Sequence, residues 1–156
     1  MAKAKEERKV VGFLLRNIKT EQFATIEQAY QEGSQISIKI GFDFGLLEEE
    51  RGLSCLTHVE FLAGDSPFII IKVRCDFGID PKKWDELIDH KKDLITFSGG
   101  FLQHLAVLTT GTTRGVLHAK TEDTPFSNIL MPTLNITKMV DKDMSFELEA
   151  QREQTT

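Results

Sequence analysis

Three stretches in the first half of the chain alternate between apolar and polar residues. They are Ile36–Phe44, Leu53–Phe61 and Ile69–Ile79. A period of two is the pattern of a β-strand with one buried face. Turn-forming breaks at residues 48–52 and 63–67 separate the stretches, so we expect consecutive strands joined by hairpins. This part of the chain therefore predicts an antiparallel meander.

A fourth segment precedes these three. Residues 9–26 mix β-forming and polar side chains and fit either an irregular strand or an amphipathic helix. We favour the strand, which brings the meander to four strands.

The periodicity changes after the third alternating stretch. Asp80 is a good N-cap and Pro81 suits the first helical position, so a short helix is expected to begin there. A longer helix is expected from Ser98 toward Gly115 or beyond, although Gly111 and neighbouring threonines weaken its end. Its apolar stripe consists of Leu102, Leu105, Ala106 and Thr109.

The C-terminal third carries weaker signals. Residues 120–127 are expected to form a loop, and Pro132 keeps the apolar piece at residues 129–135 from being a central strand. Residues 140–149 fit either a strand or a helix. The predicted fold is α+β: a four-stranded antiparallel β-meander, then a long helix and a C-terminal segment. We expect one domain over residues 9–150, with disordered tails at 1–8 and 151–156.

The charge of the chain argues against one class of function. The formal net charge is −5 and the isoelectric point is near 5.4, whereas a nucleic-acid binder needs a basic surface to displace counterions. Near the N-terminus a basic cluster is interrupted by Glu6 and Glu7. We interpret it as a solvated tail, and we expect no nucleic-acid partner.

The two cysteines, Cys55 and Cys75, fall on the apolar positions of alternating stretches. No secretory signal or membrane span is recognisable, so we expect reduced, buried thiols in a cytoplasmic protein. A disulfide between neighbouring strands is the lesser alternative.

Catalytic and metal-binding motifs are not recognisable. The four histidines do not fall at the spacings of metal ligands, and we expect no metal or cofactor. Gly111–Gly115 lacks the glycine-to-lysine spacing of a phosphate-binding loop. An enzyme with a pocket around His104, Arg114 and His118 is the last of three hypotheses, because no spacing supports it. We therefore expect a binding protein.

The order of elements and two short motifs resemble the SecB family of export chaperones. In that family a four-stranded antiparallel sheet precedes a long helix that ends near an Arg-Gly pair, and a Pro-x-Leu-Asn segment follows. The residues here that match this order are Arg114, Gly115, Pro132, Leu134 and Asn135. The sequence departs from the pattern where Val116–Met131 separates the two motifs. It also has residues 96–100 in place of an aromatic-proline step before the helix.

The resemblance implies an ATP-independent chaperone that binds unfolded or nascent polypeptides along apolar grooves. It implies protein export or folding as the setting, assembly as a homo-oligomer (dimer or tetramer), and a translocation ATPase as a further partner. An alternative on the same fold is an interaction subunit dedicated to one partner, in a toxin–antitoxin or phage-related system. The residues we predict for a client groove or interface are Phe42, Phe44, Phe61, Phe77 and Phe101.

Overall fold

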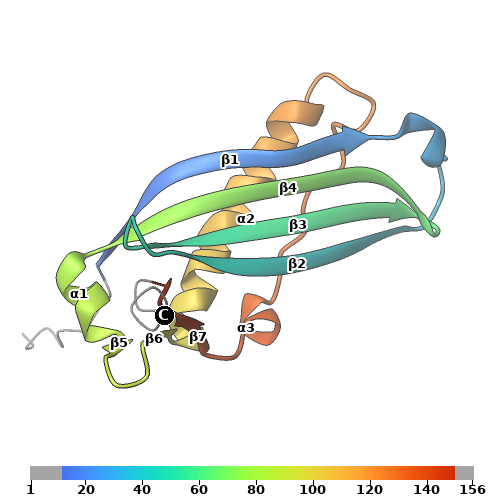
Figure 1. Ribbon diagram of the computed structural model, residues 1–156. Helices are drawn as coiled ribbons and strands as arrows, with labels where there is room; N and C mark the ends of the chain where they lie inside the picture. Colours follow the sequence, from blue (N-terminus) through green and yellow to red (C-terminus); the bar gives the residue numbers. More distant parts are fainter. Residues whose placement is uncertain (1–11, 150–156) are drawn as a thin grey trace, which may run out of the picture.

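Four long antiparallel strands form the main sheet of the computed structural model, which describes residues 12–149. Its strands are β1 (Phe13–Thr25), β2 (Ile36–Leu47), β3 (Gly52–Ala63) and β4 (Ser66–Ile79). They lie in the order β1-β4-β3-β2 (Figure 1). The predicted α+β fold class is confirmed. The predicted four-stranded meander is wrong in one respect: only β2 to β4 form a meander, because β1 pairs with β4 and not with β2.

The connection from β1 to β2 crosses one end of the sheet. It contains the 3₁₀ turn η1 (Glu27–Ala29). At its start the Ile26 N–H donates to the Phe68 carbonyl over 2.8 Å, and at its end the Gly64 N–H donates to the Gln35 carbonyl over 3.2 Å. These bonds hold the connection against both sides of the β3–β4 turn, so β1 and β2 become the two edges of the sheet.

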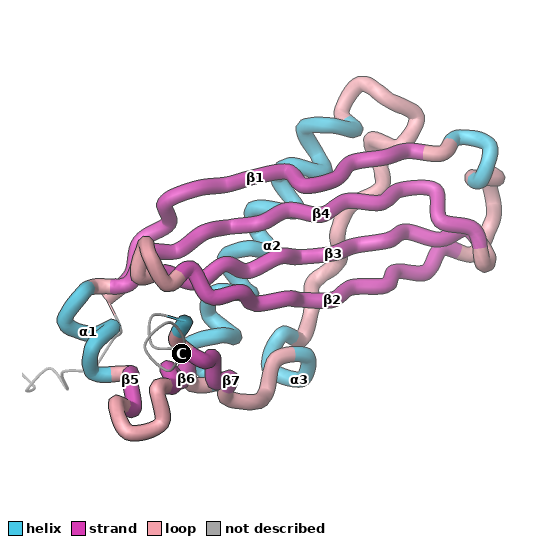
Figure 2. Tube along the Cα trace, in the orientation of Figure 1, coloured by secondary structure: helices cyan, strands magenta, loops and turns pink. Residues whose placement is uncertain are grey.

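A single long helix, α2 (Gly99–Thr121), crosses one face of this sheet obliquely (Figures 1 and 2). The helix begins next to Ser98, the predicted start, and the Ser98 Oγ caps it by accepting from the Phe101 N–H over 3.2 Å. The carboxylate of Asp143 accepts from the Gly99 N–H over 2.7 Å and satisfies another donor of the first turn. All four residues of the predicted apolar stripe are buried.

The helix continues past Gly115, through a run of threonines. Buried hydroxyls at Thr109, Thr113 and Thr121 each donate to the carbonyl four residues earlier, over 2.7–2.8 Å. Because these hydroxyls are satisfied inside the helix, they can lie against the sheet without an unpaired polar group.

A second, smaller sheet closes the end of the main sheet from which α1 (Pro81–Glu86) leaves. It contains β5 (Ile88–Asp89), β6 (Leu94–Phe97) and β7 (Met144–Glu147) in that order. Of the strand and the helix considered for residues 140–149, the structure has the strand, β7. Strands β5 and β6 were not predicted, because they are short and flank a polar turn.

The C-terminal part of the chain returns along α2 to reach this small sheet. Residues 122–135 contain no helix or strand, and the one-turn helix α3 (Ile136–Met139) follows them. The loop predicted at 120–127 begins only at residue 122, because α2 includes residues 120 and 121, and the predicted non-strand segment is confirmed. The tails predicted at 1–8 and 151–156 lie outside the described residues.

The core fills the space between α2 and the sheet in two clusters. One, toward α1, contains Cys55, Cys75 and Leu105, and the other contains Phe61 and Leu117 at the opposite end. Cys55 lies directly opposite Cys75 in the β3–β4 register, and both are free and buried. The prediction of core thiols is confirmed.

Candidate binding surface

The face of the main sheet turned away from α2 is covered with paired charges. At its centre the Arg74 guanidinium contacts the carboxylates of Glu21 at 2.6 Å and Asp76 at 3.0 Å. His58 and Glu60 lie 3.4 Å apart on β3. Side chains in ion pairs of this kind suit a solvated face. Charged contacts therefore dominate the centre of this face, although Leu14, Leu56 and Ile70 also lie on it.

The opposite face is apolar, and one helix does not cover all of it. A helix is about 10 Å wide, whereas strands of this length extend over about 40 Å. Because α2 crosses obliquely, it leaves one corner of the sheet along β1 and another along β2 (Figure 2). The rest of the chain leaves the corner along β1 open and covers part of the corner along β2.

The corner along β1 is open, and we call it the β1 flank: Leu15 and Ile18 of β1 with Leu108 of α2. Ile18 is 48% exposed, although its neighbour in the register, Cys75, is 1% exposed. Leu15 is 45% exposed and Leu108 is 41% exposed. The β1 flank is therefore a strip of large apolar side chains in contact with solvent.

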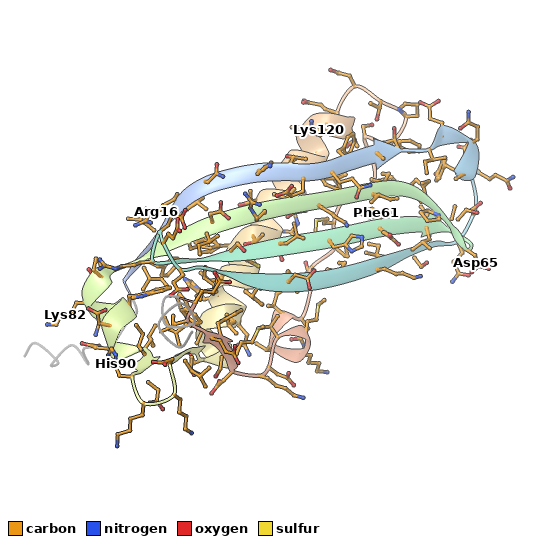
Figure 3. The ribbon with its side chains drawn as sticks, in the orientation of Figure 1. Arg16, Phe61, Asp65, Lys82, His90 and Lys120 are labelled. Atoms are coloured by element: carbon orange, nitrogen blue, oxygen red, sulfur yellow. The ribbon has the colours of Figure 1, made fainter. Side chains whose placement is uncertain are left out.

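Two aromatic contacts bound the β1 flank. At one end the Phe13 ring packs edge-on against Phe101 and His104, with ring centres 5.6 and 5.5 Å apart. At the other end the Lys120 ammonium lies 5.5 Å from the centre of the Phe23 ring. Figure 3 shows Lys120 near the end of α2, beside β1. Between these contacts the helix and the strand leave the strip uncovered.

The corner along β2 is partly roofed by the returning chain. Arg114 of α2 donates from Nε to the Met131 carbonyl over 3.3 Å and from Nη2 to the Pro132 carbonyl over 3.1 Å. Met131 is buried, and Leu134 packs against both core clusters. The matching motif residues Arg114, Pro132 and Leu134 thus fix the returning segment against the helix.

A shallow groove runs between α2 and this segment, and we call it the apolar groove. Its volume is about 470 Å³, and it is lined by Val107 and residues 133–137. Val107 is 51% exposed at its edge. No lining side chain carries a charge. Asn135, the last motif residue, is at the start of α3, where its carboxamide oxygen accepts from Thr137 Oγ1 over 2.6 Å.

The five phenylalanines predicted for a groove or interface fall into two groups. Phe61 and Phe77 are each 1% exposed, in the core between β3, β4 and α2, so they do not reach the surface of this chain. Figure 3 labels Phe61 on β3. The other three, Phe42, Phe44 and Phe101, are half-buried at the edges of the core. The prediction that Phe61 and Phe77 line a groove or interface is therefore wrong for this chain, because α2 covers the inner strands on which they lie.

The exposed apolar residues of both corners were not predicted. Leu15 and Ile18 lie in the irregular first strand, where the alternation is unclear. Val107 and Leu108 adjoin the apolar stripe of the helix but fall outside it. Two consecutive large apolar residues beside a complete stripe are the signal that could have found them.

A larger cavity lies at the end of the sheet beside α1. It encloses about 1170 Å³, with Trp84 and Phe146 among apolar residues and Arg16 and Arg51 among charged ones. Its carboxylates are Glu48, Glu49, Glu50, Asp85, Glu147 and Glu149. No histidine, cysteine, serine or threonine lines it. The cavity has therefore no nucleophile or general base other than carboxylates.

The three residues of the hypothetical catalytic group all lie on α2. Neither cavity is lined by His104, Arg114 or His118. Arg114 holds the returning segment, and His104 packs against Phe13. Within residues 12–149, no group of three or more metal-ligating side chains comes together. None of the helices in that range is long and apolar enough to span a membrane.

The two thiols are poor nucleophiles. Burial raises the pKa of Cys55 from 9.0 to about 12 and also raises the pKa of Cys75. A protonated, buried thiol does not react readily. They belong to the core rather than to a site.

Comparison with solved structures gives a likeness of fold. No family model matches the sequence, and no curated protein matches it. Among solved structures, the chain is similar to the SecB-like chaperone Rv1957 of Mycobacterium tuberculosis, determined in complex with a ChAD peptide from the HigA1 antitoxin Rv1956. The alignment covers 79% of this chain and 91% of that one, at 8% identity and a TM-score of 0.40.

Proposed function

We propose that this protein binds non-native polypeptide segments on the α2 side of its main sheet, without ATP and without a catalytic step. The observation that supports this most is the asymmetry of the two faces. One carries paired charges, and the other leaves large apolar side chains exposed at both corners. Contiguous exposed apolar surface marks interaction sites. An unfolded chain is the partner class whose apolar side chains are themselves exposed.

The expected affinity is modest. Burying one Leu, Ile or Val side chain gains about 1.5–3 kcal/mol, and much of that gain offsets the loss of motion on association. Three or four such contacts gain about 5–12 kcal/mol, and association costs about 4 kcal/mol or more, so the Kd is expected to be micromolar at the tightest, near −8 kcal/mol. Binding of this strength releases its client without an energy source, which suits folding or export in the cytoplasm.

We assign client binding to the apolar groove, because it has two fixed walls and no charged lining. The test is suppression of aggregation of a chemically unfolded protein, followed by light scattering. Val107→Ser is expected to weaken suppression at least threefold. The matched control is Leu14→Ser, since Leu14 is 58% exposed but pairs with Gly78 on the charged face. Equal effects of the two variants, or no suppression by the parent protein, would refute the assignment.

We assign self-association to the β1 flank. A two-fold contact between two copies would pack the β1 flank of one against the β1 flank of the other. An added Cβ at Gly111 or Gly115 on the neighbouring helix surface would meet no atom within 4 Å, so a second chain can approach closely there. Multi-angle light scattering should show a dimer or tetramer that dissociates in Ile18→Ser. A monomeric parent protein would reject this assignment.

A second candidate is an interaction subunit dedicated to one partner. The observation in its favour is the fixed wall of the groove, since the two Arg114 hydrogen bonds suit a preformed site for one sequence. Binding of a single native protein in the nanomolar range, with no suppression of aggregation for unrelated unfolded proteins, would select this candidate.

A further inference from the structure

The two free edges of the main sheet differ in regularity. On β1 the register with β4 shifts between Leu15 and Asn17 and again between Thr20 and Gln22. On β2 the register with β3 runs from Ile36 to Leu47 without a shift. Bulges disrupt the ladder and protect an edge from pairing with another chain. By this criterion β1 is a guarded edge and β2 is not.

The sequence of β2 carries only part of the usual protection of an edge strand. It contains no proline, and its charged residues, Lys39 and Asp43, both lie on the charged face of the sheet. Its α2 side carries only apolar residues: Ile36, Ile38, Ile40, Phe42, Phe44 and Leu46. Within residues 12–149 no strand pairs with the outer side of β2. An extended edge of this kind is a template for an added strand.

We infer that β2 binds an extended segment of the client by antiparallel strand addition, the pairing that every neighbouring strand of the main sheet makes. This inference rests on the proposed polypeptide-binding function and deepens it. Alternate side chains of the added strand would face the α2 side, beside Ile38, Ile40 and the returning segment. The remaining side chains would lie on the charged face, beside Lys39 and Asp43. These two residues lie four positions apart on the same face.

The chemistry of β2 therefore specifies the segment. It is an alternating stretch of about six to ten residues, with β-branched or aromatic residues at every second position. Its other positions carry an acidic residue opposite Lys39 and, four positions away, a basic residue opposite Asp43. Opposite charges facing each other across strands are favourable, and like charges are not. The two charges also set the direction and register of the added strand.

Backbone chemistry of the ligand tests this without altering the protein. The probe is a labelled ten-residue peptide of the stated pattern, titrated into the full chain by fluorescence anisotropy. Two versions carry N-methyl groups on alternate residues, one set on the odd positions and the other on the even ones. In a strand pairing, only the N–H groups of alternate residues point toward β2. The version methylated at those residues should lose affinity about tenfold or more, and the other version should bind like the unmethylated peptide.

Each outcome has a defined meaning. If both methylated versions bind like the parent, or both lose binding equally, strand addition is wrong. A parent peptide that fails to bind, while an unfolded protein binds at the groove, also rejects strand addition but leaves the proposed function standing. Failure of every non-native chain to bind rejects the proposed function itself. Exchanging the acidic and basic residues of the peptide should weaken binding at least threefold; an unchanged affinity would overturn the charge assignment.

Discussion

Replacing Arg114 by alanine should loosen the wall of the apolar groove. The guanidinium makes two hydrogen bonds to carbonyls of the returning segment, at Met131 and Pro132. A hydrogen bond to a charged group contributes about 1.5–3 kcal/mol when buried, and less where solvent reaches it. Because Arg114 is only half-buried, we expect Arg114→Ala to lower the free energy of unfolding by about 1–3 kcal/mol in total.

Two measurements check this prediction. Urea unfolding followed by circular dichroism gives the global loss, and hydrogen exchange should show faster exchange at residues 129–137 than in the parent protein. The stability of Arg114→Lys should lie between those of the parent protein and Arg114→Ala, because an ammonium group cannot make both hydrogen bonds of the guanidinium. His118→Ala, at an exposed position on the same helix, is the control and should change stability by less than about 0.5 kcal/mol. Unchanged exchange at residues 129–137 in Arg114→Ala would refute the role given to this arginine.

Three further predictions concern the core. Gly52→Ala should lower the free energy of unfolding in urea by about 1–3 kcal/mol, because its added Cβ would overlap the Phe77 carbonyl. Gly41→Ala is the control, because a Cβ there has free space, and equal effects of the two variants would contradict the prediction. Leu105→Ala, at a fully buried site, should cost about 2–5 kcal/mol, and a loss below about 1 would show looser packing. The pKa of Cys55, raised to about 12, predicts that the native thiol resists a disulfide reagent until the chain unfolds. It also predicts that stability falls from about pH 9 toward pH 12, because the unfolded thiol ionises first; rapid labelling of the native thiol would refute both.

The inner strands could be predicted because burial of one face imposes a period of two. Strand β1 could not be assigned as firmly, since it is an edge strand with two register shifts. Each shift adds a residue and breaks the alternation, as at Arg16 between Leu15 and Asn17. Its place beside β4 depends on a connection that crosses the sheet, which local patterns do not encode.

The small sheet was missed because its pairing is short and distant in sequence. Phe97 pairs with Met144 in the β6–β7 register, across the whole of α2. Four-residue strands carry too few alternations to be recognised, and their stability comes from these long-range contacts.

The candidate surface shows a different limit. Phe42 and Phe77 occupy equivalent positions in alternating strands, but one is half-buried on an edge strand and the other is in the core. Alternation reports which face a side chain occupies. It does not report how far that face is covered, which depends on where α2 crosses the sheet. For the same reason the exposed residues Ile18 and Val107 could be found only from the structure.

The most direct test of polypeptide binding places a photo-crosslinking amino acid at a single position on either face. One variant carries it at Val107 in the apolar groove, and the other carries it at Lys72 on the charged face of β4. Each is mixed with an unfolded polypeptide in low denaturant and irradiated. The account predicts crosslinks from position 107 and few from position 72. Equal crosslinking from both faces, or none from position 107, would contradict it.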